Sequence, residues 1–347
     1  MKRDSNIELL RIVAMLLVLF VHANYLSLGA VEPNDITNSP IDSFFKALLE
    51  QLCTICVNVF VLISGWFGIK SSIKGAISLL FQVFFFHILI IIAAICIGET
   101  ITLHTIIDCF YFGSPYWFVT SYLVLYAISP ILNSFIETAS PRLYLSVLCA
   151  FFFVEFALGW ATDLASFKSG YSAISFVGLY LLANFIRTHS KRLLNLGICQ
   201  NFLLYFICSI VPIAIFFLTK HDFNMIAYSS PFVISASIFF FLAFNKMTIS
   251  STAVNYLACS SFSIYLVHQH PVGCRHFIDL MSSTFEKVGG YWYILFVLIF
   301  ALVFGLLCIM LDKVRIRIWH FICKIFLDKA ISNYKKLIDK IYLRLGY

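Results

Sequence analysis

Apolar stretches of about twenty residues recur along the whole chain, and this feature limits the possible folds more than any other. A helix needs roughly 20 consecutive apolar residues to cross the hydrocarbon core of a bilayer. Only 12% of the residues are charged and 61% are hydrophobic, so a water-soluble fold would lack polar side chains to cover its surface. Breaking the runs at Gly, Pro and charged clusters predicts an all-α, polytopic membrane protein with about ten transmembrane helices, near residues 7–28, 43–68, 76–98, 116–136, 142–162, 171–188, 200–219, 225–245, 253–270 and 290–312.

The basic residues are distributed unevenly between the loops that connect these helices. Of the 24 Lys and Arg, 19 fall on the side of the N-terminus and 5 on the opposite side. The positive-inside rule then predicts that the N- and C-termini are both cytoplasmic. We expect a ten-helix domain over 1–312, followed by a basic amphipathic cytoplasmic tail over 313–347 that lies on the anionic membrane surface. The net charge of +7 therefore reflects topology, and we expect no nucleic-acid partner.

The eleven cysteines lie mostly inside apolar segments, where a thiol behaves as a small hydrophobic group. Their pattern predicts neither a disulfide framework nor a metal site. Cys53 and Cys56 have the C-x-x-C spacing of redox motifs, but they lie within a hydrophobic run rather than at the start of a helix after a strand. The sequence leaves the role of this pair open.

Ionisable residues at membrane depth are rare because they cost about 2.5–3.5 kcal/mol on insertion scales, so each is a candidate functional residue. Arg11 and His22 are eleven residues apart, which on an α-helix places them on one side and ~16 Å apart along the axis. That face would join a cytoplasmic anion site to a titratable imidazole. Alternatively, Arg11 is a snorkelling anchor and His22 a packing residue.

Two further ionisable residues are predicted at the depth of His22, judged by counting from the cytoplasmic end of each helix. Glu155 and His268 could share a layer with that imidazole. Glu155 would orient a histidine or bind a sugar hydroxyl, or else serve as a buried partner of Tyr or Ser. His268 lies near a helix end and could simply cap it. Gln82 and His87 are interpreted as helix–helix hydrogen-bonding residues.

Four segments of the chain together resemble the membrane-bound acyltransferase-3 family, the O-acyltransferases of bacterial surface glycans. The segments are Asn6–Arg11 followed by His22, Val57–Phe67 with its Ser-Gly-aromatic phrase, Tyr116–Tyr126 running on to Pro130, and Ser263–His268. They occur in the family's order, and the resemblance implies ten helices. Two features depart from many members: only Lys70 and Lys74 follow the Ser-Gly-aromatic phrase, where others have an Arg-rich cluster, and the chain carries no soluble hydrolase-like domain. The chain resembles the stand-alone members.

The resemblance implies an enzyme of the bacterial cytoplasmic (inner) membrane that transfers an acyl group, most often acetyl, from cytosolic acyl-CoA to a hydroxyl of a surface glycan or its lipid-linked precursor. No bound cofactor is implied, since acyl-CoA is a co-substrate. His22 would act as the base or as an acyl carrier, with Arg11 and Glu155 assisting. The candidates for binding the donor phosphates are the cationic residues Arg11, Lys70, Lys74 and Arg187. The candidates for binding the acceptor are the aromatic or imidazole residues Trp66, Trp117, Tyr265 and His268.

Two other classes of membrane protein have similar composition. A transporter or flippase of lipid-linked glycans favours helices broken at matching Gly or Pro positions in two repeats, and here only Pro212 lies well inside an apolar run. A glycan polymerase favours Arg-rich outer loops, and here the outer side has 5 basic residues. The sequence determines neither the acceptor hydroxyl nor the acyl length nor the oligomeric state.

Overall fold

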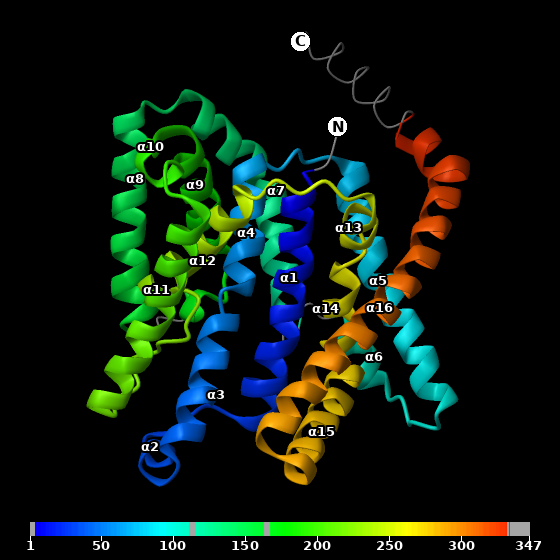
Figure 1. The fold of residues 1–347 in the computed structure, drawn as a ribbon. Helices are drawn as coiled ribbons and strands as arrows, with labels where there is room; N and C mark the ends of the chain where they lie inside the picture. The colour runs from blue at the N-terminus through cyan, green and yellow to red at the C-terminus, as the bar shows by residue number, and fades with distance from the viewer. Residues whose placement is uncertain (1–3, 111–115, 163–166, 332, 334–347) are drawn as a thin grey trace.

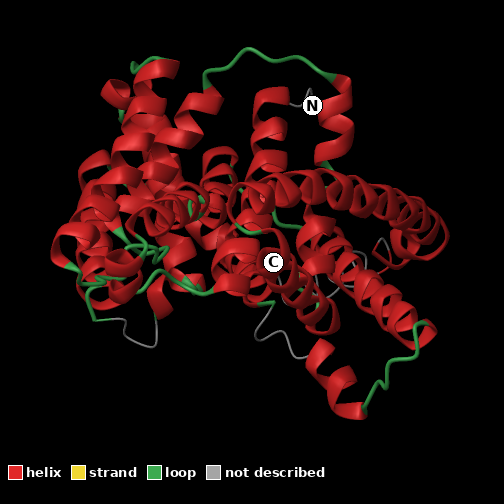
Figure 2. Ribbon diagram, turned by 60° about the horizontal axis from the view of Figure 1, so that its bottom comes forward, coloured by secondary structure: helices red, strands yellow, loops and turns green. Residues whose placement is uncertain are grey.

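The fold is described from a computed structural model of the chain, over residues 4–110, 116–162, 167–331 and 333. These residues form helices joined by loops and turns, and they contain no strand (Figure 2). The all-α class predicted from the sequence is confirmed. The helices are α1 (Ser5–Val21), α2 (Pro33–Asn38), α3 (Pro40–Cys53), α4 (Cys56–Phe67), α5 (Ile73–Cys96), α6 (Leu103–Phe110), α7 (Trp117–Thr138), α8 (Pro141–Val154), α9 (Ala173–His189), α10 (Lys191–Leu194), α11 (Ile198–Thr219), α12 (Pro231–Asn245), α13 (Thr252–Ala258), α14 (Phe262–His268), α15 (Pro271–Val288) and α16 (Gly290–Ile322).

Three of these helices continue into π-helical segments, and one short 3-10 turn precedes α9. The π-helical segments are η1 (His22–Leu26) after α1, η2 (Glu155–Trp160) after α8 and η4 (Cys323–Leu327) after α16. The 3-10 turn is η3 (Lys168–Gly170). The basic stretch after residue 312 thus begins as a direct continuation of α16.

Seven segments of the described chain are long and apolar enough to cross a membrane, and each overlaps one predicted span. They are Ser5–Leu26, Pro40–Phe67, Ile73–Cys96, Trp117–Thr138, Pro141–Trp160, Ile198–Thr219 and Gly290–Ile331. The other three predicted spans are α9 with 17 residues, α12 with 15, and the separate helices α13 and α14 with 7 each. The protein is therefore a polytopic membrane protein, but the predicted number of ten spans is not confirmed.

Hydroxyl side chains bonded to backbone carbonyls lie at the breaks within two of the predicted spans. Such side chains can bond to nearby carbonyls and compete with the regular helix. Between α3 and α4, Thr54 donates to the carbonyl of Glu50 at 2.8 Å. Between α13 and α14, Ser261 donates to the Ala258 carbonyl at 3.0 Å and Ser263 to the Ser260 carbonyl at 2.7 Å. Both breaks lie beside the pocket described below.

Helix α1 runs through the middle of the molecule and contacts α3, α4, α12, α13, α14 and α16 (Figure 1). Leu10, Ala14 and Leu19 on it are almost fully buried. The start of α1 and the end of α16 lie at the same end of the molecule, whereas α2 and α15 lie at the opposite end (Figure 1). The start of α1 and the end of α16 therefore lie on one side, as the predicted topology requires of these two helix ends.

The Ser-Gly-aromatic phrase on α4 has a packing role. A Cβ atom added at Gly65 would lie 2.3 Å from the backbone oxygen of Tyr180 on α9, so only glycine permits this close approach. Beyond the crossing, the Tyr180 hydroxyl accepts from the Ile69 amide at 2.8 Å and donates to Asn133 Oδ1 at 2.6 Å. The phrase therefore joins α4 to α9 and α7.

Candidate active site

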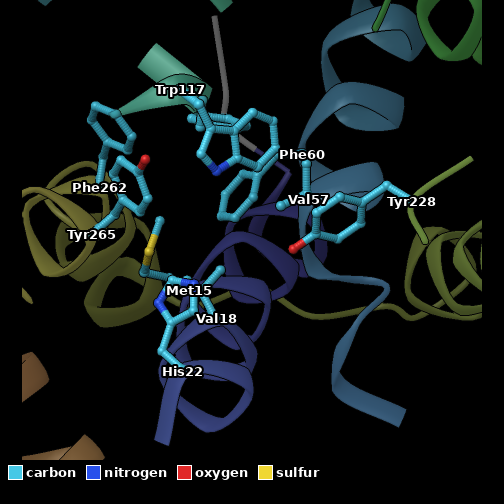
Figure 3. Close-up of a pocket in the computed structure, with 10 residues that line it drawn as sticks. Met15, Val18, His22, Val57, Phe60, Trp117, Tyr228, Phe262 and Tyr265 are labelled. Atoms are coloured by element: carbon cyan, nitrogen blue, oxygen red, sulfur yellow. The ribbon is translucent and has the colours of Figure 1, made fainter. Parts of the chain in front are cut away.

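A small pocket lies against the middle of the molecule, between α1, α4, α7, α14 and the turn before α12 (Figure 3). Its volume is about 20 Å³, and all but one of its lining side chains are apolar or aromatic. The exception is His22, which lies at the end of α1 and is partly exposed. The lining residues are Met15, Val18, His22, Val57, Phe60, Trp117, Phe118, Tyr228, Phe262 and Tyr265.

His22 is hydrogen-bonded to His268, at the end of α14. The Nδ1 atom of His22 lies 2.8 Å from Nε2 of His268, and the two ring centroids are 5.1 Å apart. The other ring nitrogen of His268, Nδ1, lies 2.6 Å from the carbonyl oxygen of Ile264. His268 is 2% exposed, so protein atoms hold its ring on both sides.

The contacts of His268 favour one tautomer of His22. A carbonyl oxygen only accepts, so Nδ1 of His268 carries its proton, and Nε2 of the neutral ring then has a lone pair. Nδ1 of His22 must donate to that lone pair, and Nε2 of His22 is left as an unprotonated base. Nε2 of Gln269 lies 2.9 Å from the same Nδ1 of His22, so a protonated Nδ1 requires the Gln269 carboxamide in the flipped orientation, with its oxygen toward His22.

The backbone changes from α-helix to π-helix at His22. Such π-helical turns occur often at functional sites. Ser27 stabilises the turn by donating to the carbonyl of His22 at 3.0 Å, and Tyr293 on α16 donates to the carbonyl of Ala23 at 2.6 Å. Nothing in the hydrophobic pattern of this segment indicates the change of helix type.

Arg11 occupies the same face of α1 as the pocket. Met15, Val18 and His22 all line the pocket, and Arg11 lies one turn before Met15 at matching helical spacing. The predicted common face of Arg11 and His22 thus agrees with the structure. Arg11 itself does not line the pocket; its side chain is 41% exposed, and its Nη1 lies 3.9 Å from Glu8 Oε1.

Aromatic rings form the far wall of the pocket. The rings of Phe118 and Tyr265 lie 5.8 Å apart, and those of Trp117 and Tyr228 lie 5.9 Å apart. Tyr228 belongs to the turn before α12, and Asn58 on α4 fixes that turn by donating to the Tyr228 carbonyl at 2.9 Å. Residues 225–230, predicted as the first turns of a span, instead fold against α3 and α4 because Asn58 and Gln51 bind their carbonyls.

The remaining candidates from the sequence lie elsewhere. Trp66 packs on Phe241 with ring centroids 5.0 Å apart, away from the pocket. Glu155, at the start of η2, is buried beside Ser175 and does not line the pocket. The structure therefore does not bring Glu155 to the pocket that His22 lines.

The predicted cationic residues for the donor all lie on exposed parts of the chain. Lys70 follows α4, Lys74 lies in the first turn of α5 and Arg187 in the last turn of α9, so these helix ends share the end of the molecule at which α1 begins (Figure 1). Lys74 Nζ already lies 2.6 Å from Asp328 Oδ1. Among these cationic candidates, Arg11 lies on the face of α1 that lines the pocket.

A second group of buried rings lies beside the pocket and was not recognised in the sequence. His87 on α5 is 5.0 Å from both Tyr116 and His270 between ring centroids, and Tyr116 donates to the carbonyl of Leu266. His270 follows His268 and Gln269 in sequence, so the continuation of that histidine-rich phrase was the available signal. The predicted interhelical role of Gln82 is confirmed by its bond to Asp312 Oδ1 on α16 at 3.0 Å.

Within the part of the chain that the structure describes, no three His, Cys, Asp or Glu residues are grouped so as to hold a metal ion. Cys53 and Cys56 are buried, free thiols, so the C-x-x-C pair forms no disulfide in this structure.

The sequence model of the acyltransferase-3 family, described as an acyltransferase domain, matches residues 4–313. The matched range runs from the start of α1 into α16 and contains every residue of the pocket. No curated protein and no solved structure matches the chain.

Proposed function

Because the chain belongs to the acyltransferase-3 family, we propose that this membrane acyltransferase moves an acetyl group from cytosolic acetyl-CoA to a hydroxyl of a surface glycan or its lipid-linked precursor. The observation that carries the proposal is the hydrogen-bonded pair of His22 and His268 at the pocket. The pair supplies an oriented base, which is what a sugar hydroxyl requires before it can attack a thioester.

The reaction follows from the tautomer of His22. Nε2 of His22 takes the proton of the acceptor hydroxyl while the hydroxyl oxygen attacks the carbonyl carbon of the thioester. The tetrahedral intermediate then collapses, the carbon–sulfur bond breaks, and the leaving thiolate receives the proton from His22. His268 stabilises the transient imidazolium by accepting from Nδ1 of His22, so it is a positioning residue rather than a reacting one.

The donor approaches along the face of α1 that Arg11 and His22 share. Arg11 stands ~16 Å from His22 along the helix axis and is exposed enough to bind a phosphate of coenzyme A. With the phosphates held there, the thioester end of the donor extends past Met15 and Val18 toward the imidazole. In this proposal the protein lies in the bacterial inner membrane, and the end of the molecule where α1 begins faces the cytosol.

An acyl group carried covalently on His22 is the alternative chemical route. In that route Nε2 of His22 attacks the thioester first, and the acceptor hydroxyl then displaces the imidazole from the acyl carbon. Both routes need the same free Nε2, and both make His22 essential.

Replacement of His22 tests the proposal. We expect His22→Ala and His22→Gln to abolish acetylation of the surface glycan, measured by mass spectrometry in a strain lacking the gene and complemented with each variant. His221→Ala, which replaces an exposed imidazole before α12, is the matched control and should retain full acetylation. Full activity of His22→Ala at normal membrane levels would remove His22 from the mechanism.

A further inference from the structure

The pocket beside His22 is much smaller than the two substrates that must meet there. Its free volume is about 20 Å³, and roughly 10–15 Å³ of such volume holds one water-sized group. A methyl group is close to a water molecule in size, whereas a sugar ring or the pantetheine arm of coenzyme A is many times larger. The pocket therefore has room for one small group, and the larger parts of both substrates remain outside it.

The polarity of the lining selects which part of the substrates enters the pocket. Apart from the imidazole of His22, the walls are apolar or aromatic side chains. A sugar hydroxyl or a phosphate would give up hydrogen bonds to water there, which costs free energy, but the methyl group of an acetyl has none to lose. That methyl is also bonded to the carbonyl carbon that is attacked beside Nε2 of His22. The end of the acyl group is thus the fragment that fits the pocket in both size and polarity.

Phe60 on α4 forms part of the wall opposite the face of α1 that carries His22. Figure 3 shows its ring across the pocket from Met15 and Val18, which precede His22 on that face. In a volume of this size, a group that contacts the imidazole also reaches the opposite wall. An acyl chain that extends beyond one methyl group therefore meets the ring of Phe60.

The side chains packed around Phe60 keep this wall in place. The ring of Phe60 meets that of Phe118 edge to face, with centroids 6.2 Å apart, and Phe118 in turn contacts Phe262 at 6.2 Å and Tyr265 at 5.8 Å. Phe118 and Tyr265 are buried, and so is Val57, which lines the pocket one turn before Phe60 on α4. Packed side chains accommodate an extra methylene only by leaving their preferred rotamers or shifting the backbone, which costs free energy. The wall therefore opposes any acyl chain longer than acetyl.

We propose that Phe60, held by Phe118, limits the transferred group to acetyl and is a specificity-determining residue of the proposed reaction. Acetyl and propionyl groups are transferred by the same step: the bond from the glycan oxygen to the acyl carbon forms, the carbon–sulfur bond breaks, and the hydroxyl proton ends on the thiol of coenzyme A. Only one methylene distinguishes the two donors. The inference rests on the proposed acyl transfer and deepens it by naming the side chain that sets the length of the acyl group.

The test compares two donors with one acceptor. Purified full-length protein in detergent receives radiolabelled acetyl-CoA or propionyl-CoA, together with glycan extracted from a strain that lacks the gene. One methylene in an apolar pocket changes kcat/KM by roughly 10- to 200-fold, so we expect the unsubstituted protein to favour acetyl by a ratio in that range. Phe60→Ala should lower this ratio about tenfold or more by raising kcat/KM for propionyl-CoA. Phe239→Ala, which truncates another partly exposed phenylalanine, on α12 and outside the pocket, is the matched control and should keep the ratio.

The outcomes separate this inference from the proposed function. If the unsubstituted protein transfers neither acyl group to the glycan, the proposed function fails and the inference falls with it. If it transfers both groups with equal kcat/KM, or if Phe60→Ala keeps the ratio of Phe239→Ala, the limit on acyl length is overturned while the transferase activity stands. A lower ratio that comes only from slower acetyl transfer also contradicts it. Should Phe60→Ala lose its thermal transition, Phe60→Leu takes its place: a lower ratio supports the proposal, and an unchanged ratio overturns it.

Discussion

Replacing His268 gives the sharpest test of the two-histidine arrangement. His268→Ala removes the imidazole that accepts from Nδ1 of His22, and it leaves the Gln269 carboxamide, the partly exposed His22 and the apolar walls of the pocket in place. The lost bond is to a ring that becomes positively charged in the transition state. Such bonds contribute about 1.5–3 kcal/mol, which corresponds to a fall in kcat of roughly 10- to 100-fold. In the proposed arrangement the phosphates of the donor are held at Arg11, so we expect KM for acetyl-CoA to be unchanged.

His268→Gln distinguishes positioning from packing. The Gln carboxamide oxygen can accept from Nδ1 of His22, so this variant should recover part of the activity that His268→Ala loses. The assay is initial-rate transfer from radiolabelled acetyl-CoA, with the thermal transition in detergent reporting the folded fraction. His189→Ala, which removes an exposed imidazole at the end of α9, is the control. Equal kcat for His268→Ala and His189→Ala would refute the positioning role, and equal loss in the Ala and Gln variants would reduce it to packing.

Two further substitutions test the face of α1 and the crossing of α4. Arg11→Ala should raise KM for acetyl-CoA about tenfold. Arg11→Lys should give an intermediate KM, because a lysine keeps the charge but not the bidentate geometry. If Arg11→Ala has the same KM as Arg142→Ala, which replaces an exposed arginine, Arg11 does not bind the donor. Gly65→Ala should destabilise the fold by about 1–3 kcal/mol, since its Cβ would lie 2.3 Å from the Tyr180 oxygen. The thermal transition in detergent measures this, and Gly197→Ala, whose Cβ would meet only Gln200 at 3.6 Å, should leave it unchanged.

The spacing of residues along one helix was readable from the sequence. Arg11 and His22 fall on one face because helical periodicity is a local property, and the structure places Met15 and Val18 of that face in the pocket. The apolar runs likewise predicted the helical class and ten spans, seven of which correspond to segments long enough to cross a membrane. The other three are not confirmed: α9 has 17 residues, α12 has 15, and the third is divided into α13 and α14, where Ser261 and Ser263 bond to backbone carbonyls.

The sequence was a poorer guide to which side chains meet across different helices. Counting depth placed Glu155 and His268 beside His22, yet only His268 meets it, because depth along a helix says nothing about the direction in which a side chain points. Trp66 was expected at the acceptor for its ring, but it packs on Phe241. Tyr228 entered the pocket from a stretch predicted to be helix, because Asn58 holds its backbone.

The sequence by itself determined an all-α membrane protein, its family and the pairing of a guanidinium with an imidazole on helix α1, since each depends on composition or on the period of a single helix. Only the tertiary structure decided which residue is hydrogen-bonded to His22 and which aromatic side chains line the pocket with it. These depend on how helices rotate and break against one another, and that packing is fixed by contacts such as Gly65 with Tyr180 between residues far apart in the chain.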